Sequence, residues 1–152
     1  MNKEIYFLDL TQRPPRSFKA RLGDLVILPR LLDKGRATIN GKSGEYEYFT
    51  SMDQHLVDFL NFDPDELLKE LATGKGDWEM LEWVRNHSKT PRASWEIEVW
   101  SAHMERRGPN SDPETMKWFT EYVHARTTTR EDIKTWFDAL ELDDYVTFGG
   151  KA

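Results

Sequence analysis

Residues 28–41 read LPRLLDKGRATING, and this stretch predicts the first helix of the chain. Its apolar positions recur every three to four residues, which is the period of an amphipathic helix. Proline near the start and Gly41 after the end are typical helix limits. The predicted helix therefore runs from about Pro29 to Asn40 and turns one apolar arc toward the core. That arc consists of Leu28, Leu32, Gly35 and Ile39.

Capping residues predict further helices along the chain. An N-cap side chain accepts a hydrogen bond from a free N–H group of the first helical turn. We expect helices to open at Ser51, Asp63, Asp77, Ser94, Asp112 and Thr128. Residues 95–99 also alternate as a strand would, but the arginines, glycine and proline at 106–109 are typical of a helix end, so a helix is favoured there.

The last two predicted helices have clear apolar stripes. The helix that follows Asp112 is expected to turn Met116, Phe119 and Val123 inward. The helix that follows Thr128 has the cleanest period in the chain, with apolar residues at i, i+3, i+4 and i+7. These residues are Ile133, Trp136, Phe137 and Leu140.

Length and pattern together predict one all-α domain. A chain of 152 residues, of which 38% are hydrophobic, is long enough to bury a core of its own. No repeat, low-complexity tract or Pro/Gly-rich linker divides it. We predict a compact single-domain bundle of six or seven short helices over residues 1–152. An extended arm over 1–23 and an irregular tail over 143–152 flank these helices.

Composition excludes several classes of protein. The chain has no cysteine, which excludes disulfides, thiolate metal sites and thiol nucleophiles. Its charged N-terminus is unlike a signal peptide, and no apolar run approaches the ~18 residues of a membrane span. A net charge of -6 argues against nonspecific nucleic-acid binding. We therefore expect a cytoplasmic protein that binds neither membrane nor nucleic acid.

Several stretches of the chain resemble one known family. They read DLTQRPPRS at residues 9–17, LPRLLDKGRA at 28–37, NGKSGEY at 40–46, REDIKTWFD at 130–138, DDYV at 143–146 and FGGKA at 148–152. The family is bacterial and is catalogued only as a domain of unknown function, and the resemblance runs nearly from end to end. It implies a single helical domain and brings no reaction, cofactor or partner.

Basic residues gather in the first quarter of the chain. Residues 1–42 carry nine Lys and Arg against four Asp and Glu, whereas residues 43–152 carry twelve against 23. Two prolines hold the arm extended beside Arg16, and Arg30 and Lys34 stand four apart on the first helix. Arginine binds carboxylate or phosphate with two hydrogen bonds. We therefore predict an arginine-rich groove for a small acidic ligand or an acidic partner.

Aromatic residues are the candidates for the walls of that groove. The chain has six tryptophans, and an indole that is not fixed in the core can line a ligand pocket. Trp83, Trp100 and Trp118 are the candidates. Arg16, Arg30, Lys34 and Trp100 are the predicted ligand-binding residues.

Three alternatives compete with this hypothesis. In the first, Arg16 and Arg30 form internal salt bridges with the acidic helices. In the second, a small enzyme uses Asp33 or His103 as a general base while an arginine holds a substrate carboxylate. In the third, the chain is a structural or interaction protein, such as a homodimer with an exposed aromatic patch. The histidine spacing predicts no metal site, and we expect no cofactor.

Overall fold

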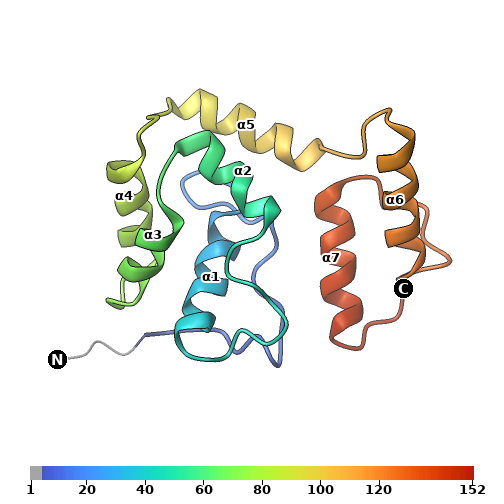
Figure 1. Cartoon of the computed structure of the whole chain (residues 1–152), viewed down its shortest axis with the longest axis horizontal. Helices are drawn as coiled ribbons and strands as arrows, with labels where there is room; N and C mark the ends of the chain where they lie inside the picture. The colour runs from blue at the N-terminus through green and yellow to red at the C-terminus, as the bar shows by residue number, and fades with distance from the viewer. Residues whose placement is uncertain (1–4) are drawn as a thin grey trace. The chain divides into compact units, whose positions relative to one another are not determined.

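The computed structural model describes residues 5–152 (Figure 1). These residues form seven α-helices and no β-strand, which confirms the predicted all-α class with six or seven short helices. The helices are α1 (Leu28–Ile39), α2 (Ser51–Leu60), α3 (Pro64–Leu71), α4 (Asp77–His87), α5 (Ser94–Arg106), α6 (Pro113–His124) and α7 (Trp136–Thr147). Within the described range, no helix combines the length and the apolar character that crossing a membrane requires.

The chain falls into two compact units, and the boundary between them lies inside α5. Unit 1 ends at Val99 and contains α1 to α4. Unit 2 begins at Trp100 and contains α6 and α7. That residues 1–152 form a single domain stays a prediction.

The helix α1 is the buried centre of unit 1. Ten of its twelve residues are buried, whereas the sequence predicts only one buried arc. It contacts α2 and α3, and α3 in turn contacts α4. Because a buried charge is costly without a partner, the surrounding segments must supply partners for its four buried charged residues. These are Arg30, Asp33, Lys34 and Arg36.

Gly35 lets α3 and the chain before α2 approach α1 closely. A Cβ atom at this position would lie 2.6 Å from Leu71 Cδ1 and 3.1 Å from Tyr48 Cε2. Any larger residue would therefore push its neighbours apart. Glycine inside a helix costs about 1 kcal/mol relative to alanine, and this close packing explains why the cost is accepted here.

The described part of the arm, residues 5–23, contains neither helix nor strand, and residues 1–4 of the predicted arm lie outside the described residues. The arm leads into α1 through Ile27, the N-cap residue, whose φ is 76°. A β-branched residue is strained in this left-handed region. Ile27 is fully buried, and its N–H donates to the Phe18 carbonyl oxygen (3.0 Å). The packed surroundings therefore hold this backbone conformation.

Two helices of unit 1 begin differently from the prediction. Thr50 caps α2 in place of Ser51, which is the first helical residue. Gly76 caps α4, and its N–H donates to the Glu79 carboxylate (3.2 Å). The predicted cap Asp77 is instead the first residue of α4, which leaves its carboxylate available for contacts outside the helix.

Unit 2 has its own apolar core between α6 and α7. The helix α6 begins after its predicted cap, Asp112, which accepts the Thr115 N–H (2.9 Å). The predicted inward orientation of Met116 is wrong, because this side chain is 48% exposed. The buried core residues are Phe119, Val123, Ile133, Ala139 and Leu142.

The helix α7 begins at Trp136 rather than near Thr128, and the predicted helix start is therefore wrong. Thr135 caps the helix, since its hydroxyl oxygen accepts the Asp138 N–H (3.1 Å). The helix also continues through residues 143–147, for which the sequence pattern predicts an irregular tail. Threonine is a preferred cap residue, so local preference alone does not decide between Thr128 and Thr135 as the start of this helix.

Candidate functional site

A cleft of about 630 Å³ lies within unit 1. Three segments that are far apart in the sequence form it: the N-terminal arm, α1, and the α3–α4 loop with the first turn of α4. A cavity of this volume is typical of small-molecule sites. Residues 5–8 supply an apolar wall, and most of the remaining lining residues are charged. The charged residues are Arg13, Arg16, Asp33, Arg36, Lys75, Asp77 and Glu79.

The arm places Arg13 and Arg16 at the cleft. Pro14 and Pro15 fix their own φ angles, which keeps this part of the chain out of a helix. The Arg16 backbone N–H donates to Asp33 Oδ2 (2.9 Å), so the arm is tied to α1 at this point. Arg13 is exposed, and its side chain forms no hydrogen bond or ion pair with the described residues.

Arg16 is held between two carboxylates. Its Nε and Nη2 donate to Asp33 Oδ2 and Oδ1 (2.9 and 3.0 Å), which is a bidentate pair. Its Nη1 donates to Asp77 Oδ2 (2.9 Å). Burial alone would lower the pKa of Arg16, but the hydrogen bonds and negative charges of Asp33 and Asp77 outweigh burial and raise it. Arg16 is thus a permanent cation that orders both neighbouring segments.

Asp77 joins Arg16 to Arg36. Arg36 Nη1 donates to Asp77 Oδ1 (2.8 Å), and Arg36 Nη2 donates to the Lys75 carbonyl oxygen (3.2 Å). Burial would raise the pKa of Asp77, but hydrogen bonds from the two arginines lower it below its usual 3.8. The cleft therefore holds an alternating row of charges, which we call the cleft charge row: Asp33, Arg16, Asp77 and Arg36.

The α3–α4 loop brings Asp77 to the arginines. Gly74 has a φ of 88°, a left-handed conformation that glycine adopts without strain. Lys75 forms an ion pair with Glu70, and Gly76 caps α4. Sequence reasoning missed this loop and Arg36 as parts of the site. The signal that could have found the loop is a lysine between two glycines directly before a helix.

Arg30, a predicted ligand-binding residue, does not line the cleft. Its Nη1 donates to the carbonyl oxygen of Arg16 (3.3 Å). Its guanidinium carbon lies 4.4 Å from the ring centroid of Phe18, which is a cation–π contact. Arg30 therefore holds the arm against α1 from a buried position.

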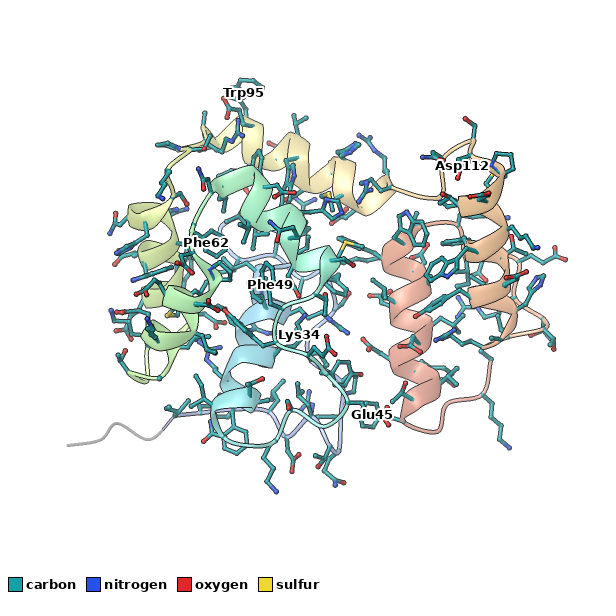
Figure 2. All side chains as sticks on the ribbon, viewed as in Figure 1. Lys34, Glu45, Phe49, Phe62, Trp95 and Asp112 are labelled. Atoms are coloured by element: carbon teal, nitrogen blue, oxygen red, sulfur yellow. The ribbon has the colours of Figure 1, made fainter. Side chains whose placement is uncertain are left out.

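Lys34, also predicted to bind ligand, forms a buried ion pair with Asp53 of α2. Figure 2 labels Lys34 on α1. Nζ lies 2.5 Å from Asp53 Oδ2, and the two side chains are 2% and 0% exposed. The same oxygen accepts the N–H and the hydroxyl of Thr50 (2.8 and 3.0 Å), whereas Asp53 Oδ1 has no hydrogen-bond partner in the described part of the chain. This pair links α1 to α2 and does not line the cleft.

The remaining predicted residues lie elsewhere. Trp100 and His103 belong to unit 2, so their grouping with the arginines stays a prediction. Trp83 is buried and stacks on the His87 ring, with 4.2 Å between the ring centroids. Trp118 is more than half exposed. Neither of these two tryptophans lines the cleft.

The small enzyme and the homodimer both stay predictions. Asp33, a candidate general base, accepts three hydrogen bonds from Arg16, so the contacts of its carboxylate serve to orient that arginine. Among residues 5–152 no group of three His, Asp or Glu side chains is arranged to hold a metal ion. For the homodimer, exposed aromatic side chains are present, and Figure 2 labels one of them, Trp95, near the start of α5.

Comparison with known proteins identifies a family. No curated protein matches the chain. The domain of unknown function DUF5069 matches residues 12–146. This range includes every charged residue that lines the cleft within residues 5–152, whereas the apolar wall at residues 5–8 precedes it. The chain belongs to the DUF5069 family.

Proposed function

We propose that the protein binds a small acidic ligand in the cleft of unit 1. The observation that carries this proposal is the position of Arg13. It lines the cleft, it is exposed, and its side chain has no carboxylate partner among the described residues. Arg13 therefore presents a positive charge and several N–H donors to an anion.

The cleft charge row supports Arg13 in this role. The ion pairs of Arg16 are those that the salt-bridge alternative predicts, and they fix the arm on which Arg13 lies. Arg36 uses Nη1 and Nη2 in hydrogen bonds to Asp77 and Lys75, and a guanidinium has five N–H donors in all. In this proposal Arg13 contacts the ligand directly, Arg36 offers a second donor group, and Arg16 positions the site.

Calorimetric titration of the full chain tests the proposal. The probes are acetate, hexanoate and inorganic phosphate. We expect at least one of them to bind at a single site, and Arg13→Gln to weaken that binding about tenfold, as the loss of one charge-assisted hydrogen bond implies. Arg13 is exposed, so this variant should fold normally, which circular dichroism would verify.

The matched control is Lys42→Gln. Lys42 is an exposed cation of the same unit, it lies outside the cleft, and its replacement changes the net charge equally. Its titration should equal that of the parent chain. Binding of none of the three anions, or equal loss of binding in Arg13→Gln and Lys42→Gln, would overturn the proposal.

A further inference from the structure

We infer that the ligand is a monoanion with an apolar body, such as an aliphatic or aromatic monocarboxylate. This inference rests on the proposed function and specifies the chemical class of the ligand. Two properties of the cleft support this inference: the pairing of its charges and the apolar wall at residues 5–8.

The charged residues that line the cleft can balance one added negative charge. Arg16 and Arg36 are paired with Asp33 and Asp77, and Lys75 is paired with Glu70. Of the described cations that line the cleft, Arg13 is the one whose side chain has no carboxylate partner. A second negative charge on the ligand would find no further cation of this kind among the described lining residues and would lie near the Asp77 carboxylate. Like charges at such distances repel, so the pairing disfavours dianions and polyphosphates.

The wall at residues 5–8 offers apolar contact beside this cation. Ile5, Phe7 and Leu8 are half-buried, and Tyr6 is 78% exposed. All four residues line the cleft, and all four have apolar or aromatic side chains. Covering such surface stabilises a complex in proportion to the area removed from water. A ligand with a hydrocarbon chain or ring therefore gains contacts that a bare inorganic anion does not.

Four probes test the inference by calorimetry on the full chain. They are acetate, hexanoate, hexanedioate and hexan-1-ol, the last three of which have the same chain length. We expect hexanoate to bind about tenfold more tightly than acetate, because its additional methylene groups contact the apolar wall. Hexanedioate and hexan-1-ol should bind more weakly than hexanoate, the first because of its second charge and the second because it has none.

Two variants separate the charge from the apolar contact. Glu79→Gln removes one negative charge from the cleft, and glutamine can keep the capping bond to Gly76. We expect it to improve hexanedioate binding relative to hexanoate about threefold, as removing a repulsion across several ångströms of water implies. Tyr6→Ser should weaken hexanoate binding and leave acetate binding unchanged. Since Tyr6 and Glu79 are exposed, both variants should fold.

The outcomes distinguish the inference from the proposed function. Hexanedioate binding as tightly as hexanoate, or acetate binding as tightly as hexanoate, overturns the inferred class and leaves an anion site in place. Hexan-1-ol binding as tightly as hexanoate overturns the acidic ligand itself. Binding of none of these four probes overturns the inferred class, and failure of inorganic phosphate to bind as well overturns the acidic ligand itself.

Discussion

The two ion-pair systems on α1 differ in their contact with water. The Lys34–Asp53 pair is almost completely buried, whereas in the cleft charge row the side chains of Arg16 and Asp77 are 37% and 31% exposed. Removing charges from water is costly, and the cost is recovered only while both partners remain. An ion pair that stays in contact with water loses less free energy when it is broken, because water then solvates the separated charges. The buried pair is therefore committed to holding α1 and α2 together, whereas the Arg16–Asp77 pair of the cleft charge row keeps its contact with water.

Breaking the buried pair is expected to have the largest effect. Lys34→Met leaves the Asp53 carboxylate buried without its cation, and such losses typically cost about 3–5 kcal/mol. Urea denaturation at neutral pH would measure the free energy of unfolding. Lys42→Met, at an exposed position, is the control and should change it by less than about 0.5 kcal/mol. A similar small change in both variants would show that the buried pair does not stabilise the fold.

Breaking the cleft charge row should cost less. Arg16→Ala removes the bidentate pair with Asp33 and two hydrogen bonds to Asp77, but water reaches part of this region. We expect a loss of about 2 kcal/mol in the free energy of unfolding, measured in the same way. Arg16→Lys should recover only part of it, because an ammonium lacks the planar fork of arginine. A loss as large as that of Lys34→Met would contradict the comparison.

Acid should weaken the cleft charge row in particular. The pKa of Asp77 is lower in the folded chain than its usual 3.8, so its charged form favours folding above that value. As the pH falls through the folded pKa, both states become protonated and this stabilisation is lost. Asp77→Asn should remove this part of the acid dependence, as urea denaturation between pH 5 and 2 would show. An unchanged acid profile in the variant would refute the role of Asp77.

Alkali should lower the free energy of unfolding through Tyr48, and this is the smallest of the expected effects. Burial raises the pKa of Tyr48 above its usual 10.0, and the negative charges of Asp53, Asp65 and Asp63 raise it further. The unfolded chain therefore ionises this phenol first, and the free energy of unfolding falls as the pH rises above about 10. Tyr48→Phe should lessen this fall, although it also loses the hydrogen bond to the Pro64 carbonyl oxygen. Equal alkaline profiles in the two proteins would be the contrary result.

Helix positions can largely be predicted because caps and apolar periods are local. The predicted helix starts at Asp63 and Asp112 are confirmed, since each carboxylate accepts N–H groups of its own first turn. The start of α7 could not be predicted in this way. The segment after Thr128 has both a cap and an apolar period, yet the structure places the helix start after Thr135. Packing in unit 2, which no local pattern contains, decides between them.

The candidate site is harder to predict than the helices. The sequence points to both Arg16 and Asp33, and the structure joins them by a bidentate pair. Arg30 and Lys34 are predicted to share the groove with Arg16 because they stand four apart on the first helix. In the structure these two side chains contact Phe18 and Asp53 instead. Asp77 meets Arg16 because α3 packs on α1 and α4 packs on α3. Long-range pairing of this kind is set by tertiary structure.

The unusual backbone of Ile27 constrains how this position can change. A left-handed isoleucine costs about 1–3 kcal/mol in strain, and complete burial of its side chain returns about 1.5–3 kcal/mol. These two amounts nearly cancel, so glycine would relax the backbone and at the same time leave a void. Neither isoleucine nor glycine is clearly the more stable residue here. We therefore expect this position to change slowly in evolution, and only together with the residues that pack around it.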